Sequence, residues 1–158
     1  MYYFAYGSNL HLEQMRHRCP GCVPVAPYTL PGYRLVFRGV ADIEKVDVGS
    51  VAGAIFKITP ACLRALDAYE GYPTFYIRDY FYHPEFGQVM FYRMRDQTRV
   101  CPPSDYYLRI IAVGYKHWGL PIPRLADAAD VRPRQLLGIR LNDAEKSHMF
   151  RTRTPRSA

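Results

Sequence analysis

The pattern of apolar and polar positions along the chain predicts a mixture of strands and a few helices. Aromatic and β-branched residues gather in short runs that often alternate with polar ones, which is typical of half-buried strands. The first run, MYYFAY, is almost continuously apolar and indicates a buried strand. The strands expected from this pattern are 1–6, 33–37, 51–58, 76–82 and 88–94, the last two joined through 83–87.

Capping signals mark the expected helices. Thr59 followed by Pro60 opens a helix whose apolar spacing continues to Glu70, and Gly71 supplies the stop signal. Asn9 is interpreted as a helix cap, because Asn is favoured there and the loop around it opens a helix. The other expected helices are 11–17, 104–115 and a short one near 143–149.

Proline and glycine predict the irregular parts of the chain. They make 19–31 mostly loop, with a short extended piece at 23–25, and 122–158 is expected to be irregular outside its one helix. Strands therefore dominate and helices are inserted between them. This order indicates an α+β fold, a small mixed β-barrel with surrounding helices.

Charge changes this picture little. The formal net charge is +7, but residues 131–158 hold seven basic and two acidic side chains, so the rest of the chain is nearly balanced. No aromatic-basic interleaving accompanies the charge, so nucleic acid is not an expected partner. The first residues do not follow a signal-peptide pattern and no apolar run has the length of a membrane span, so we expect a cytoplasmic protein without a membrane partner.

Five stretches carry a resemblance to a known family: FAYGSNL at 4–10, GYRLVFRG at 32–39, GSVAGAIFKI at 49–58, LDAYEGYPTFYIR at 66–78 and PPSDYYLRIIAVGYKHWGLP at 102–121. In order and spacing they resemble the gamma-glutamylcyclotransferase-like family. The resemblance assigns 1–121 to the family domain and leaves 122–158 as a basic C-terminal extension. It also implies the small barrel with surrounding helices.

The resemblance implies a reaction as well. The α-amine of a small γ-glutamyl substrate attacks its own γ-carbonyl, and 5-oxoproline and a free amine or amino acid are released. Because the nucleophile belongs to the substrate, no cofactor and no metal are expected. Such a site needs a carboxylate to move the proton and donors for the oxyanion.

Residues are assigned to these roles by their position in the family motifs. Glu70 of LDAYEG matches the catalytic glutamate, and Arg78 of Y-x-R is interpreted as structural, pairing a carboxylate or covering the core. The residues expected to contact substrate are Tyr3, Phe4, Ala5, Tyr6, Gly7, Ser8, Asn9, Tyr92 and Tyr107.

Other interpretations of the sequence stay open beside this one. Cys19-Pro20-Gly21-Cys22 has the spacing of a redox dithiol or half a zinc site, although a Pro-Gly turn accounts for it better. Ser8 lacks the G-x-S-x-G context of a hydrolase nucleophile. A non-catalytic ligand-binding or interaction protein that keeps the same cleft is the alternative function.

Overall fold

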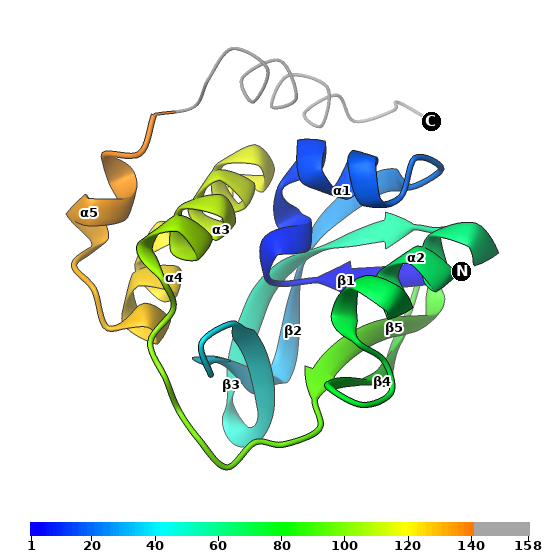
Figure 1. Ribbon diagram of the computed structural model, residues 1–158, viewed down its shortest axis with the longest axis horizontal. Helices are drawn as coiled ribbons and strands as arrows, with labels where there is room; N and C mark the ends of the chain where they lie inside the picture. The colour runs from blue at the N-terminus through cyan, green and yellow to red at the C-terminus, as the bar shows by residue number, and fades with distance from the viewer. Residues whose placement is uncertain (141–158) are drawn as a thin grey trace.

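A computed structural model describes residues 1–140 of the protein (Figure 1). Five strands form one sheet in the order β2-β3-β1-β5-β4, and the predicted α+β class is confirmed. The sheet is not closed, so the predicted barrel is only a loose description of it. The strands are β1 Tyr2–Ala5, β2 Val23–Phe37, β3 Ala41–Lys57, β4 Tyr76–His83 and β5 Gly87–Met94. The helices are η1 Ser8–Leu10, α1 Leu12–Arg18, α2 Pro60–Glu70, α3 Asp105–Trp118, α4 Ile122–Ala129 and α5 Pro133–Leu137.

The short strand β1 lies at the centre of the sheet. It pairs antiparallel with β3 and parallel with β5, so both of its edges are hydrogen bonded. Its residues Phe4 and Ala5 are fully buried. The end of β1 therefore delivers the following turn, residues 6–9, to the interior of the molecule.

The prediction of a loop over 19–31 was wrong, because most of it belongs to the long strand β2. Pro24, Pro27 and Pro31 lie in this strand, which is at the edge of the sheet and pairs with β3 alone. A proline cannot donate to a ladder, but at an edge strand its missing N–H can face away from the partner. The register shifts at Pro24/Ala26 and Pro31/Tyr33 absorb the remaining irregularity.

The prediction that 122–158 is irregular was also wrong for its first part. Helices α4 and α5 occupy 122–129 and 133–137, and Leu125 and Leu136 are buried in the main core. The helix expected near 143–149 lies outside the described residues. Figure 1 shows α3, α4 and α5 grouped together, with α1 beside α3 and α2 farther away over the other part of the sheet. The boundary after residue 121 stays a prediction.

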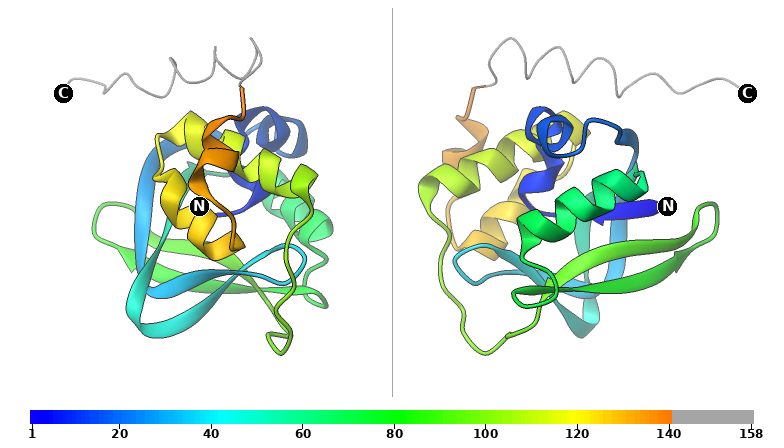
Figure 2. Two further views of the ribbon diagram at one scale, coloured as in Figure 1. Left: turned by 90° about the vertical axis from the view of Figure 1, so that its left-hand side faces the viewer. Right: turned by 45° about the vertical axis from the view of Figure 1, so that its right-hand side comes forward.

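Two helices hold the turn after β1 in place from different sides. On α3, a Cβ atom at Gly114 would lie only 2.6 Å from the Cβ atom of Leu10. Because glycine has no Cβ, the helix can approach the segment after β1 this closely. Trp118 of α3 donates from Nε1 to the carbonyl of Leu10 at 3.0 Å. On the other side, α2 lies along the β4–β5 hairpin (Figure 2). No described helix is long and apolar enough to cross a bilayer.

Candidate active site

A small cavity opens where β1 ends and the turn at 6–9 begins. The space inside it, its open mouth included, is about 290 Å³. Its lining is rich in tyrosine and contains a single carboxylate. The lining residues are Tyr3, Tyr6, Gly7, Ser8, Asn9, Ala41, Glu70, Tyr76, Tyr92 and Tyr107.

Glu70 reaches this cavity because it is the last residue of α2. The helix begins as predicted: Thr59 caps it by accepting from the backbone N–H of Cys62 at 3.1 Å, and Pro60 is its first residue. It ends at Gly71, whose φ of 64° is the left-handed conformation that glycine adopts at little cost. The buried Leu66 fixes the rotation of the helix, so the final residue faces the turn after β1.

Burial sets the charge state of this carboxyl group. It raises the pKa of Glu70 from 4.5 to about 7, because a low-dielectric environment disfavours the charged form. A hydrogen bond from the Asn9 amide and the charge of Arg18 oppose this effect without cancelling it. Glu70 is therefore a group that both takes and returns a proton near neutral pH.

Asn9 contacts the carboxylate directly. Its Nδ2 donates to Glu70 Oε1 at 2.9 Å and to the Tyr3 hydroxyl at 2.8 Å. The interpretation of Asn9 as a helix cap was wrong, since α1 is capped by His11, which accepts from the N–H of Gln14. The side chain of Asn9 instead joins the turn to the candidate catalytic group.

The tyrosine hydroxyls in the lining mostly bind the protein itself. Tyr6 donates to the carbonyl of Tyr92 at 2.7 Å, and Tyr92 in turn donates to Asp67 at 2.7 Å. Tyr76 donates to the carbonyl of Ala41 at 2.5 Å. Burial raises the pKa of each of these hydroxyls, so they stay protonated. The wall they form is polar, yet it holds no second charge.

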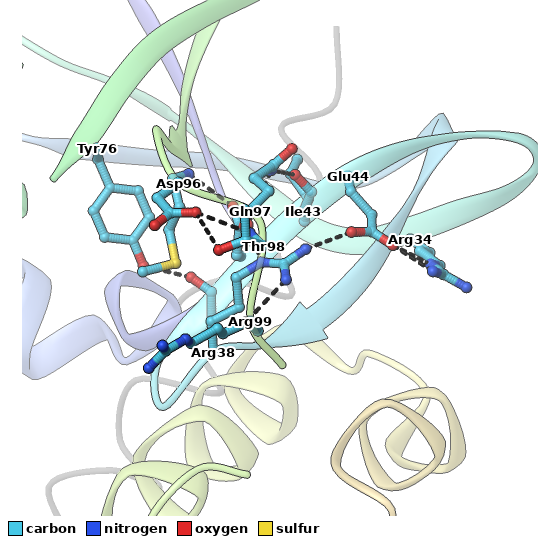
Figure 3. A network of polar contacts seen from close by, with 12 residues as sticks. Arg34, Arg38, Ile43, Glu44, Tyr76, Asp96, Gln97, Thr98 and Arg99 are labelled. Atoms are coloured by element: carbon cyan, nitrogen blue, oxygen red, sulfur yellow. Dashed lines mark hydrogen bonds and ion pairs between the residues drawn. The ribbon is translucent and has the colours of Figure 1, made fainter. Parts of the chain in front are cut away.

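Ala41 forms another part of the cavity wall, and both of its backbone polar groups are hydrogen bonded. Its carbonyl accepts from the Tyr76 hydroxyl, and its N–H donates to the hydroxyl of Tyr107 at 3.2 Å. The next residue, Asp42, is fully buried and accepts from Arg38 Nε at 2.9 Å and from Gln97 Nε2 at 2.9 Å. Figure 3 shows Arg38, Gln97 and Tyr76 converging on this segment. The wall is thus fixed by a buried ionic network.

The structure brings together most of the side chains that the sequence predicted for the site. Tyr3, the turn from Tyr6 to Asn9, Glu70, Tyr92 and Tyr107 all line the cavity. Phe4 and Ala5 do not: both are fully buried, and the Phe4 ring packs edge-on against Phe81. Sequence reasoning missed Ala41 and Tyr76. The Y-x-R stretch was a usable signal for Tyr76, whereas nothing local marks Ala41.

Two further sequence interpretations can be compared with the structure. Arg78 pairs with Asp67 through a two-pronged contact, so its predicted structural role in binding a carboxylate is confirmed. Cys19 and Cys22 are free thiols at the ends of a turn, closed by a hydrogen bond from the Cys22 N–H to the Cys19 carbonyl at 2.9 Å. Within residues 1–140, no group of three or more metal-binding side chains is assembled.

Comparison with known proteins gives the same result at the level of the family. Residues 3–109, more than half of the chain, match the family described as gamma-glutamyl cyclotransferase, AIG2-like. Gamma-glutamylcyclotransferases of Bos taurus and Homo sapiens are each 27% identical, over 86% of this chain and 81% of the relative. A solved gamma-glutamyl cyclotransferase has a TM-score of 0.72 at 24% identity, covering 96% of this chain and 98% of that one. An uncharacterised Homo sapiens protein has a TM-score of 0.69 at 25% identity, covering 94% and 97%. The chain belongs to the gamma-glutamyl cyclotransferase, AIG2-like family.

Proposed function

We propose that this protein cleaves a γ-glutamyl amide by intramolecular attack of the substrate's α-amine, releasing 5-oxoproline and a free amine or amino acid. The observation that carries the proposal is the position of Glu70. Its carboxyl group lies in a small tyrosine-lined cavity, beside the turn at 7–9, with a pKa of about 7. Family membership supplies the class of reaction.

In this mechanism Glu70 moves one proton twice. As a carboxylate it takes a proton from the substrate's α-ammonium group, which frees the amine's electron pair to attack the γ-carbonyl carbon. A tetrahedral intermediate forms with the negative charge on the γ-oxygen. When the intermediate collapses, the bond to the leaving nitrogen breaks and the protonated Glu70 returns the proton to that nitrogen. The ring nitrogen, which still carries two protons, releases one of them to solvent and becomes the neutral lactam N–H, and the free amine takes up a proton from water.

The turn after β1 gives the substrate its place. Its backbone N–H groups at 7–9 are the proposed donors to the γ-oxygen, and one such donor typically contributes about 3 kcal/mol to a transition state. Gly7 leaves room for this approach: a Cβ atom there would lie 3.1 Å from that of Ala41 and 3.4 Å from the Tyr107 hydroxyl. Confinement between these walls favours the curled substrate that ring closure requires.

A covalent route through the protein has less support. Ser8 carries the aliphatic hydroxyl of the lining, and its Oγ lies 3.3 Å from the Tyr69 hydroxyl rather than against a histidine. The described lining contains no histidine, lysine or cysteine. A serine without a base at hydrogen-bond distance is a weak nucleophile.

The test is release of 5-oxoproline from a panel of γ-glutamyl amines, γ-glutamyl dipeptides and glutathione. We expect turnover of at least one of them by the wild type, and its loss in Glu70→Gln and Glu70→Ala. Glu85→Gln removes an exposed carboxylate in the β4–β5 turn and is the matched control. Full turnover in Glu70→Gln would contradict the role of Glu70.

Calorimetry with 5-oxoproline and a γ-glutamyl dipeptide separates the enzyme from the alternative function. Binding of either ligand without any product over hours would identify a non-catalytic ligand-binding protein that keeps the cleft. The panel also decides the leaving group, which the proposal leaves open. A cytoplasmic location stays a prediction of the sequence.

A further inference from the structure

Arg18 lies next to the cavity but does not line it. It is the last residue of α1, and its guanidinium group links three elements of the structure. Nη1 donates to Asn9 Oδ1 at 2.9 Å, and Nη2 donates to Gln14 Oε1 at 2.8 Å and to the Tyr69 hydroxyl at 2.8 Å. The guanidinium carbon also lies 3.9 Å from the centre of the Tyr69 ring. These contacts hold the Arg18 side chain between α1 and α2.

The contact with Asn9 decides which way the Asn9 amide faces. An amide has an accepting oxygen at one end and a donating nitrogen at the other, whereas an arginine only donates. Arg18 therefore holds Oδ1 of Asn9, which leaves Nδ2 to donate to Glu70 and Tyr3. If the amide turned over, Oδ1 would face the carboxylate and two acceptors would meet.

We propose that Arg18 is a positioning residue: acting through Asn9, it holds the Glu70 carboxyl group in the orientation that the reaction needs. The proposal rests on the proposed function. Tyr69, the residue before Glu70, gives Arg18 a second hold on the end of α2. The helix end and the turn after β1 are thereby kept in one arrangement.

The charges around Glu70 give Arg18 a measurable signature. The titratable groups that face Glu70 from other elements are tyrosines of β1, the turn after it, β4, β5 and α3, namely Tyr3, Tyr6, Tyr76, Tyr92 and Tyr107. All of these have raised pKa values, so they are neutral near pH 7. Arg18 is the cation whose charge lowers the pKa of Glu70. Removing the charge of Arg18, which also frees the Asn9 amide, should therefore raise the pKa of Glu70 and favour its protonated form.

The variants Arg18→Gln and Arg18→Lys separate charge from orientation, and Arg64→Gln is the control. Arg64 is an exposed cation on α2, the helix that ends at Glu70, so its removal changes net charge equally. The first readout is titration of the Glu70 carboxyl carbon by ¹³C NMR without substrate, assigned with Glu70→Gln. The second is the pH profile of kcat/KM, with kcat and KM measured separately.

For Arg18→Gln we expect the Glu70 midpoint and the acid limb of kcat/KM to move to higher pH by about one pH unit. We expect kcat to fall roughly tenfold to a hundredfold, because small misplacements of a catalytic group have effects of this size. KM should change less than kcat, since Arg18 does not line the cavity. Arg18→Lys keeps the positive charge but loses the planar guanidinium group that donates to several acceptors at once. It should therefore lower kcat with a smaller change in the Glu70 titration midpoint. Arg64→Gln should match the wild type.

An Arg18→Gln protein with an unchanged Glu70 midpoint and an unchanged acid limb would overturn the proposal, even if its melting temperature fell. That result would leave Arg18 with a purely structural role. A wild type without 5-oxoproline release would refute the proposed function instead. In that case the substrate-free titration still decides whether Arg18 controls the state of Glu70.

Discussion

Replacing Glu70 by glutamine should make the protein more stable at alkaline pH, although it removes the proposed catalytic group. Glu70 has a pKa of about 7 because burial disfavours its charge. Glutamine has nearly the same shape and its Oε1 still accepts from the Asn9 amide. The substitution therefore removes the buried charge while it keeps the hydrogen bond.

The sign and size of the effect follow from the two pKa values. A pKa raised in the folded state means that the folded protein binds the proton more tightly than the unfolded chain. The contribution of Glu70 to stability is thus complete below about pH 4.5 and is lost as the pH rises through about 7. The difference between the two values corresponds to roughly 3 kcal/mol of unfolding free energy. In a chain of this size, this is about 6–12 °C in melting temperature.

Urea and thermal unfolding between pH 4 and pH 9 test this prediction without any substrate. Wild type and Glu70→Gln should have similar stability at pH 4, and the variant should gain progressively up to about pH 8. Glu85→Gln, which removes an exposed carboxylate, should stay within about 0.5 kcal/mol of the wild type throughout. A constant difference between Glu70→Gln and wild type at every pH would show that the carboxylate is not buried as described.

Three further substitutions test the packing around the site. Gly7→Ala crowds the hydroxyl of Tyr107 at 3.4 Å, so we expect KM in steady-state assays to rise about tenfold with little change in melting temperature; an unchanged KM would place the substrate elsewhere. Gly114→Ala forces its Cβ to 2.6 Å from that of Leu10 and should cost about 1–3 kcal/mol in urea unfolding, whereas a neutral result would contradict the close approach. Tyr92→Phe loses the 2.7 Å hydrogen bond to Asp67 of α2 and should lower the free energy of unfolding by about 1 kcal/mol. A double-mutant cycle with Asp67→Asn should show coupling between the two side chains.

Local sequence signals predicted the elements whose geometry depends on neighbouring residues. The helix from Pro60 to Glu70 carries its own cap, its own stop glycine and an apolar stripe, and its bounds were predicted correctly. The paired strands β4 and β5 lie within one residue of the bounds expected from their sequence. In each case the residues that determine the bounds of the element lie within about ten positions of one another.

The errors arise where long-range contacts override such signals. Three prolines made β2 look like a loop, and only its place at the edge of the sheet lets it be a strand. Helix α4 lacks a side-chain cap and follows a stop signal at Gly119 and Pro121. The helix packs against α3 and β2, and its Leu125 is buried in the core that they share. Composition alone could not predict that surface.

The same division holds at the site. The family motifs identified Glu70 and the turn at 6–9, since both are contiguous in sequence. Ala41, Tyr76 and Arg18 were missed, because each enters through a contact between distant segments. Asn9 was identified but misinterpreted: its local sequence favours a cap, whereas its hydrogen bonds to Glu70 and Tyr3 exist only in the folded chain.

The contacts of the tyrosines explain how a carboxylate in a polar cavity keeps a pKa near neutrality. Hydroxyls that donated to Glu70 would stabilise its charge and lower its pKa. Tyr6, Tyr76 and Tyr92 instead donate to other oxygens, two of them backbone carbonyls. Asn9 gives the carboxylate a direct hydrogen bond, and Arg18 acts on it through that amide. A carboxylate stabilised by more hydrogen-bond donors would have a lower pKa and would take a proton from the substrate poorly. A carboxylate stabilised by fewer donors would stay protonated at neutral pH. This division of hydrogen-bond donors between the cavity wall and the carboxylate suits Glu70 to its proposed role, which is to move a proton in both directions within one turnover.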